Sequence, residues 1–244
     1  QFIHLNLQIL LLFKKYIKAL FSHILLMVID MLLKEIYSEY DYNIEITGVQ
    51  TDSRFVKPGN LFLPIRGKNF EGDEFFIDAI TKGAVAIVYD KAIHNLTIPV
   101  IIVDNLEKEL FRLIDLIYEK PYNELTMIGV TGTDGKTSVS TLTSYLLNHL
   151  SRCANIGTNG IIYDKEIIDN VFTTPILTQN YSLLREFSNL GISYVSMEVS
   201  SQGIANKRIE GILYDYAIFT NLSHEHLDTH KTMHNYFLTK LKLF

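Results

Sequence analysis

Cysteine is nearly absent from this sequence, and positive charge is not in excess. The single cysteine, Cys153, cannot form a disulfide within the chain, which predicts a reducing, cytoplasmic setting. No group of cysteine and histidine residues has the spacing of a zinc site. A net charge of −5 predicts no nucleic-acid partner. What is present is typical of a globular protein of one or two domains, because 48% of the 244 residues are hydrophobic and 20% are charged.

A long uninterrupted apolar run is also missing. Residues 1–30 are strongly apolar, but Lys14, Lys15 and Lys18 interrupt them before the roughly 18 apolar residues of a membrane span are reached. A signal peptide carries its positive charges ahead of the apolar run, and here they lie within it. We therefore expect no membrane partner, and interpret residues 1–30 as an extension that contributes nothing to function. A weak membrane anchor is the alternative reading.

Residues 31–120 alternate short apolar runs with helical patterns, which predicts a first α/β domain. The runs that have strand composition are residues 60–65, 84–89 and 99–104. Between the first two runs, residues 74–83 have helical spacing and end at Gly83, a residue suited to a helix C-cap. A second helix is predicted by apolar residues at helical spacing, Leu106, Leu110, Leu113 and Ile117. Pro121 then marks a linker.

Residues 121–244 begin with an apolar run of strand length at 125–130, followed by the glycine-rich stretch GVTGTDGKTS at 129–138. A helix is predicted next by apolar residues at helical spacing, Val139, Leu142, Leu146 and Leu150. Further buried strands are predicted at residues 193–200 and 216–221. Strands separated by helices indicate a mostly parallel sheet, and no internal repeat or low-complexity tract is present.

The glycine-rich stretch has the properties of a phosphate-binding loop. Such a loop needs backbone N–H groups at a helix N-terminus, glycines where the chain bends, a lysine for the β- and γ-phosphates and a hydroxyl for Mg²⁺. These are supplied by Gly132, Gly135, Lys136 and Thr137. The usual spacing places a further glycine at position 130, where this sequence has Val130. The alternative is a glycine-rich turn with an incidental Lys-Thr pair.

The spacing of this loop resembles the ATP loop of the Mur ligases and of their folylpolyglutamate synthetase relatives. Residues 197–211 (MEVSSQGIANKRIEG) and residues 214–244 resemble segments of the Mur ligases that add the third residue of the peptidoglycan stem. Residues 51–67 (TDSRFVKPGNLFLPIRG) resemble their N-terminal domain. The resemblance implies an α/β fold. A small uridine-nucleotide domain at 31–120 would precede a partial phosphate-loop central domain at 121–244, with a mostly parallel sheet.

The resemblance also implies an activity, ATP-dependent amide bond formation. ATP and Mg²⁺ would serve to phosphorylate a carboxylate of UDP-MurNAc-L-Ala-D-Glu, and an amino acid, meso-diaminopimelate or L-lysine, would attack the acyl phosphate. The run HLDTHKTM favours diaminopimelate slightly. We expect residues 1–244 to be a monomeric N-terminal part that lacks a third domain. Alone it would bind nucleotide weakly without turnover, and a separately encoded C-terminal part is an expected partner.

Residue roles carry over from the same resemblance. Lys136, Glu198, His226 and a carbamylated Lys240 would be catalytic, with Thr137, Glu198 and His226 as metal ligands. The residues implied in ATP binding are Gly132, Thr133, Asp134, Gly135, Lys136, Thr137, Ser138 and Asn221. Those implied in binding the uridine nucleotide are Thr51, Ser53, Thr173, Thr174, Ser200, Asn206 and Arg208.

Several positions depart from the family pattern. Phe172 replaces an asparagine that is common before Thr-Thr-Pro, Gln202 stands where histidine is common, and Glu225 replaces an aspartate. Two alternatives stay open: a non-catalytic nucleotide-binding remnant, and a related amide ligase of the cyanophycin or folylpolyglutamate type. Residues 51–67 argue against the folate enzymes, which lack the uridine-nucleotide domain.

Overall fold

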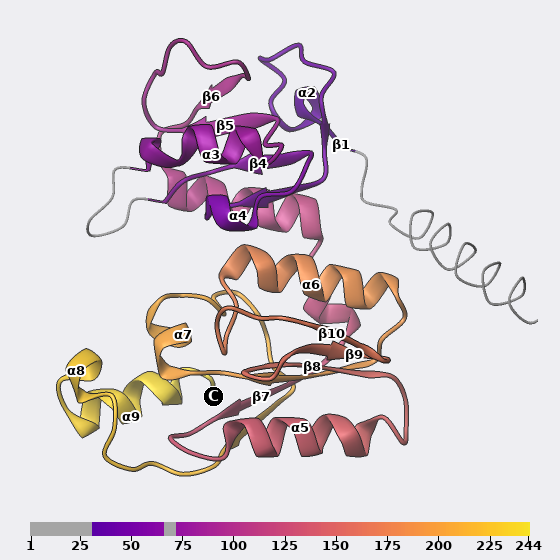
Figure 1. Ribbon diagram of the computed structural model, residues 1–244, viewed down its shortest axis with the longest axis vertical. Coiled ribbons are helices and arrows are strands. Elements are labelled where there is room, and N and C mark those ends of the chain that lie inside the picture. Colours follow the sequence, from indigo (N-terminus) through magenta and orange to yellow (C-terminus); the bar gives the residue numbers. More distant parts are fainter. Residues whose placement is uncertain (1–30, 66–71) are drawn as a thin grey trace, which may run out of the picture.

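The computed structural model describes residues 31–65 and 72–244. The extension interpreted at residues 1–30 therefore lies outside the described residues. The chain forms an α/β fold with two units, each built on its own sheet (Figure 1). None of the helices within the described ranges combines the length and apolar character needed to cross a membrane.

The first unit is built on a parallel four-stranded sheet in the order β3-β4-β5-β6. Its strands are β3 (Gly48–Gln50), β4 (Asn60–Phe62), β5 (Ala86–Tyr89) and β6 (Val100–Ile102). A small antiparallel pair, β1 (Met31–Leu32) and β2 (Glu45–Ile46), lies beside it. The helices are α2 (Leu33–Ile36), α3 (Phe76–Thr81) and α4 (Leu106–Tyr118), with 3₁₀ turns at Ser53–Phe55 and Asp73–Phe75.

Helices α3 and α4 lie where the sequence predicts helices. The side chain of Asn105 caps α4 by accepting a hydrogen bond from the Lys108 amide at 2.9 Å. All of the apolar positions that predicted this helix except Leu106 are buried. After α3, Gly83 has a φ of +101°, the left-handed conformation that a glycine adopts readily beyond a helix end. Both helix predictions are confirmed.

The second unit has a six-stranded sheet in the order β10-β9-β8-β11-β7-β12. Strands β7 (Thr126–Thr131), β8 (Cys153–Gly157), β11 (Tyr194–Glu198) and β12 (Tyr216–Phe219) are parallel. The antiparallel hairpin β9 (Gly160–Tyr163) and β10 (Glu166–Ile168) extends one edge. The helices are α5 (Lys136–Leu147), α6 (Leu177–Asn189), α7 (Ser201–Ala205), α8 (Leu227–His230) and α9 (Met233–Leu241), after a 3₁₀ turn at Pro121–Glu124.

The helix predicted after the glycine loop is present as α5, but three of the four apolar residues that predicted it are exposed. Leu142, Leu146 and Leu150 are 57%, 55% and 77% exposed, whereas Ser140 and Ser144 are buried. The helix packs on β7, β8 and β11 through these small residues, which allow it to approach the sheet closely. The hydroxyl of each serine is satisfied by a carbonyl one turn earlier in the helix.

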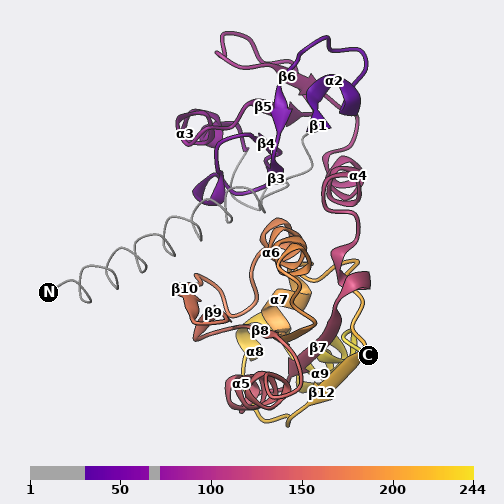
Figure 2. The same ribbon diagram turned by 90° about the vertical axis from the view of Figure 1, so that its right-hand side faces the viewer.

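The two units are held together through α6, which lies between the sheets in both views (Figures 1 and 2). A single cluster of buried apolar side chains runs through both, including Leu113 of α4 and Leu184 of α6. The Thr178 hydroxyl donates to the Gln50 side chain at 2.8 Å, and Arg185 donates to the Tyr118 carbonyl at 2.7 Å. These contacts place the carboxyl end of β3 next to the second unit.

Candidate functional site

The glycine-rich loop connects the carboxyl end of β7 to the first turn of α5, as a phosphate loop requires. Gly132 and Gly135 have φ values of +146° and +78°, which only glycine adopts without strain. A Cβ atom on Gly132 would lie 1.9 Å from the Thr220 hydroxyl. Gly132 thus leaves room for Thr220, whereas Gly135 is exposed at the N-terminus of α5, near the exposed Ser138.

Residues after β12 hold this loop in place. The Asn221 side chain accepts from the Asp134 amide at 3.0 Å and donates to the Asp134 carbonyl at 3.1 Å. The Asn221 carbonyl accepts from the Thr133 amide at 3.0 Å. Because both ends of its amide group bind the loop, Asn221 positions the backbone. The ATP contact expected of Asn221 would be a second role, and these hydrogen bonds do not test it.

Two lysines converge on the loop from different helices. The Nζ atom of Lys136 donates to the carbonyls of Gly132, at 3.1 Å, and Thr133, at 2.6 Å. The Nζ atom of Lys240, which is 1% exposed, donates to the same Gly132 carbonyl at 2.6 Å. It also lies 4.5 Å from the centroid of the Tyr236 ring. Burial, and then repulsion by Lys136, lower the pKa of Lys240 to about 8.

Glu198 occupies the carboxyl end of β11, beside the loop, and is 1% exposed. Its Oε2 atom accepts from the Thr137 hydroxyl at 2.8 Å, and its Oε1 atom accepts from the Thr158 amide at 2.9 Å. A Cβ atom on Gly157 would lie 2.1 Å from Oε1, so glycine there leaves room for the carboxylate. A buried carboxylate is therefore fixed against the hydroxyl of the phosphate loop.

The oxygen atoms of Thr137 and Glu198 fit a magnesium ion. Mg²⁺ prefers oxygen donors and keeps several waters, so one or two protein ligands together with substrate phosphates are enough. Consistent with this, the described ranges contain no group of three or more histidine, cysteine, aspartate or glutamate side chains that could enclose a metal. No hydrogen bond or ion pair among the described residues joins His226 to Thr137 or Glu198.

A cavity of about 360 Å³ brings several of the expected residues together. Lys136, Lys240 and His226 line it, together with Thr173, Ser200 and Arg208. The Thr173 hydroxyl is 3.0 Å from that of Thr158, which connects this wall to Glu198. His226 has a φ of +56° and its Nε2 atom lies 3.6 Å from Glu225.

A second cavity, of about 630 Å³, lies between the two units. Of the expected residues, Thr51, Asn206 and Arg208 line it. Ser53 and Thr174 are buried and line neither cavity. Thr174 is bonded instead to the Glu198 carbonyl, at 2.9 Å, and to the Ser200 amide and hydroxyl, so it supports the site from behind.

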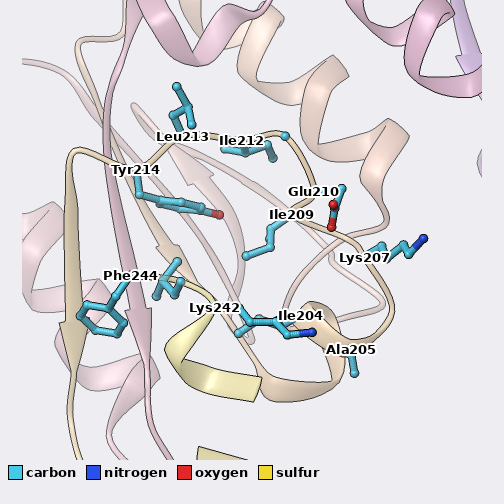
Figure 3. A pocket seen from close by; sticks show the side chains of 12 residues that line it. Ile204, Ala205, Lys207, Ile209, Glu210, Ile212, Leu213, Tyr214, Lys242 and Phe244 are labelled. Atoms are coloured by element: carbon cyan, nitrogen blue, oxygen red, sulfur yellow. The ribbon is translucent and has the colours of Figure 1, made fainter. Parts of the chain in front are cut away.

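A third cavity, of about 590 Å³, contains none of the expected residues. It lies between the segment after α7 and the end of α9, and Figure 3 shows Ile209 and the Tyr214 ring on one side and Lys242 on the other. Because it shares no lining residue with the cavity at the glycine loop and only Lys207 with the cavity between the units, we assign no part of the site to it.

Models of one protein family match most of both units. The model of the Mur ligase middle domain matches residues 130–244, which include the glycine loop, Glu198 and Lys240. The model of the Mur ligase family catalytic domain matches residues 45–114, the core of the first unit. The chain belongs to the Mur ligase family.

Two curated Mur ligases illustrate the likeness. The UDP-N-acetylmuramoyl-L-alanyl-D-glutamate--2,6-diaminopimelate ligase of Haemophilus influenzae is 38% identical over 217 residues, covering 84% of this chain and 44% of that protein. The UDP-N-acetylmuramyl-tripeptide synthetase 2 of Oceanobacillus iheyensis is 42% identical over 205 residues, covering 82% and 41%. The chain thus spans less than half the length of these relatives.

Solved Mur ligases share the fold. A UDP-N-acetylmuramoyl-L-alanyl-D-glutamate--2,6-diaminopimelate ligase aligns with a TM-score of 0.63 and 26% identity, covering 88% of this chain and 45% of that structure. The MurF ligase of Thermotoga maritima, solved in complex with ADP, aligns with a TM-score of 0.53 and 23% identity, covering 80% and 42%. The second likeness concerns the fold alone.

Some residues of the candidate site carried no prediction from the sequence. Thr158 binds Glu198, and Tyr236 lies beside both Lys240 and the Thr133 hydroxyl, 3.3 Å from it. Thr158 follows directly on the buried strand β8, and polar residues at the carboxyl ends of parallel strands meet at one edge of the sheet. Using that position requires recognising β8 as a strand, which its sequence CANIG does not reveal. Tyr236 had no comparable signal beyond its place in a helix with Lys240.

Proposed function

We propose that this chain forms the nucleotide-binding part of an ATP-dependent ligase that adds meso-diaminopimelate or L-lysine to UDP-MurNAc-L-Ala-D-Glu. The observation that carries the proposal is the convergence of Lys136, Lys240 and Arg208 on one cavity beside the glycine loop. The cations of Lys136 and Arg208 suit a reaction in which phosphoryl and carboxylate groups meet, and Lys240 has a different role described below. Peptidoglycan synthesis in the cytoplasm is the corresponding setting.

The proposal gives each unit a task. Residues 31–120 would bind the uridine nucleotide, and residues 121–244 would bind ATP, while residues 1–30 would take no part. The cavity between the units suits the sugar nucleotide, because Thr51 and Asn206 offer hydrogen-bonding groups from opposite sides. Support for this division comes from the separate sheets and from the separate ranges that the family models match.

In the proposed reaction, a carboxylate oxygen of the substrate attacks the γ-phosphorus of ATP, and ADP leaves. The amine of the incoming amino acid then attacks the acyl carbon, inorganic phosphate leaves, and the amine loses a proton. The backbone N–H groups of the glycine loop and the ammonium group of Lys136 would bind the phosphate oxygens. Bound through Thr137 and Glu198, Mg²⁺ would supply further neutralisation of phosphate charge.

Lys240 would act in modified form. Its amine reacts with CO₂ when it is neutral, forming an N–C bond and releasing one proton, so the cation becomes a carbamate anion. A pKa of about 8 leaves far more of this amine neutral at physiological pH than the ordinary value of 10.5 would. Burial and the nearby Lys136 therefore prepare Lys240 for this modification.

We expect a carbamate on Lys240 that depends on pH. Because only the neutral amine reacts, about half of the groups are competent at pH 8 and about one in a hundred at pH 6, for a pKa of about 8. In carbon NMR with ¹³C-labelled CO₂ at a fixed dissolved concentration, the carbamate signal should rise between pH 6 and pH 8. It should be missing from Lys240→Gln.

Lys242 provides the matched control for this experiment, because it lies two residues away and is exposed. The variant Lys242→Gln should keep the carbamate signal. A signal that survives in Lys240→Gln and disappears in Lys242→Gln would contradict the assignment.

The function itself is tested by calorimetry on the whole chain. We expect one equivalent of Mg-ATP and one of UDP-MurNAc-L-Ala-D-Glu to bind, because the two cavities offer separate places for them. A ligase of the folylpolyglutamate type would bind Mg-ATP without the uridine compound. No turnover is expected of residues 1–244 alone, so detectable release of ADP in a turnover assay would contradict that expectation.

A further inference from the structure

Arg208 occupies the junction of the two cavities at the proposed site. It lines the cavity between the units and also the cavity at the glycine loop, and no other residue lines both. A substrate that extends from the first cavity into the second must therefore pass its guanidinium group. The side chain is half-buried, so it is held at this point by its surroundings.

The guanidinium group of Arg208 lies over an aromatic ring. The Cζ atom of Arg208 is 4.0 Å from the centroid of Phe172, well inside the range of a cation–π contact. On the first unit, the Cζ atom of Arg54 is 5.8 Å from the same centroid. Phe172 itself lines the cavity at the glycine loop. One ring thus contacts two cations that come from the two units.

The two arginines differ in their charge partners. Arg54 forms an ion pair with Asp52 at 2.6 Å, which neutralises it locally. Arg208 forms no ion pair with any carboxylate in the described part of the chain, and its Nη1 atom donates to the Thr174 carbonyl at 3.0 Å. Burial, and then the charge of Arg54, lower the pKa of Arg208. A half-buried guanidinium group with most of its N–H groups available suits an anionic ligand.

We propose that Phe172 is a positioning residue, which holds the Arg208 guanidinium group with its N–H edge toward an anionic group of the substrate at the junction of the two cavities. The proposal rests on the function proposed above. The anion is a phosphate or a carboxylate, since both accept paired hydrogen bonds from a guanidinium fork. Both kinds of group are present in a uridine-diphosphate sugar peptide.

The identity of residue 172 matters for this role. An asparagine, which is common at this place in the Mur ligase pattern, would offer an amide that hydrogen-bonds a ligand directly. A phenylalanine ring cannot do so, but it can stack on a guanidinium face and restrict its rotation. In this chain, residue 172 would therefore affect substrate binding indirectly, by orienting Arg208.

The test compares Phe172→Leu, which keeps apolar bulk but removes the aromatic face, with Phe172→Tyr, which keeps it. Calorimetry on the whole chain would use two ligands, UDP and UDP-MurNAc-L-Ala-D-Glu. We expect Phe172→Leu to weaken binding by about three- to tenfold and Phe172→Tyr to restore it to within about twofold. Equal weakening for both ligands places the diphosphate at Arg208, and weakening for the full substrate alone places a peptide carboxylate there.

Phe55→Leu is the matched control, because the Phe55 ring contacts Arg54, with the Cζ atom at 5.6 Å, and lines neither cavity. It should bind both uridine compounds as the wild type does. If Phe172→Leu bound both uridine compounds with wild-type affinity, the positioning role alone would be overturned. The same would follow if the variant lost as much affinity for Mg-ATP as for the uridine compounds. A wild-type chain that binds Mg-ATP but neither uridine compound would overturn the substrate half of the proposed function together with this role.

Discussion

Replacing Lys136 with alanine will lower the affinity of the chain for Mg-ATP by about a hundredfold. A hydrogen bond to a charged group contributes about 1.5–3 kcal/mol, and Lys136 is placed to make such bonds with phosphate oxygens at the start of α5. The substitution also removes two bonds that hold the loop, to the carbonyls of Gly132 and Thr133. Calorimetric titration of wild type and variant with Mg-ATP measures the effect.

Lys165→Ala is the control for this measurement, because it removes the same charge from an exposed turn between β9 and β10. It should bind Mg-ATP with wild-type affinity. Equal affinities for wild type and Lys136→Ala would show that the glycine loop does not bind phosphate, despite its position between a strand and a helix.

Replacing Glu198 with glutamine will remove most of the gain in ATP affinity that Mg²⁺ provides. Wild type should bind ATP more tightly with Mg²⁺ than with EDTA, and the variant should show little difference, because a neutral amide is a poor ligand for this hard cation. The substitution also gives Thr137 or Thr158 an NH₂ group in place of an acceptor oxygen. We therefore expect a loss of about 1–3 kcal/mol in the free energy of unfolding as well.

The two effects of Glu198→Gln are separated by measuring ATP affinity with and without Mg²⁺ at a temperature where the variant is fully folded. Glu39→Gln makes the same chemical change at an exposed position of the first unit and should leave both quantities at their wild-type values. A full Mg²⁺-dependent gain in Glu198→Gln would exclude Glu198 from the metal site.

Short sequence patterns predicted the strand, loop and helix on which the candidate site is built. The run at residues 125–130 and the glycines after it predicted β7, the loop and α5, and the structure has all three. In the first unit, the predicted strands are present as β4, β5 and β6, although each is shorter than its apolar run. These predictions succeeded because composition and glycine placement act within a few residues.

Features that depend on distant neighbours were not predictable in this way. Strand β8 has the sequence CANIG, whose small and polar residues conceal that every one of them is buried. The face that α5 turns to the sheet is set by how closely the helix must approach, so serines are buried and leucines exposed. Likewise, the bonds of Thr174 to Ser200 and Glu198 join residues far apart in sequence and exist only after folding.

The way the glycine loop is held has a consequence for the order of events during synthesis. The Thr133 hydroxyl accepts from the Ser223 amide, 90 positions later, and the Gly132 carbonyl accepts from Lys240, 108 positions later. Contacts between residues so far apart in sequence can form only after the intervening chain exists, and they slow folding because a long loop must close. As the chain leaves the ribosome, the nucleotide loop therefore reaches its final shape late, after α9 has emerged, although its own residues were made long before.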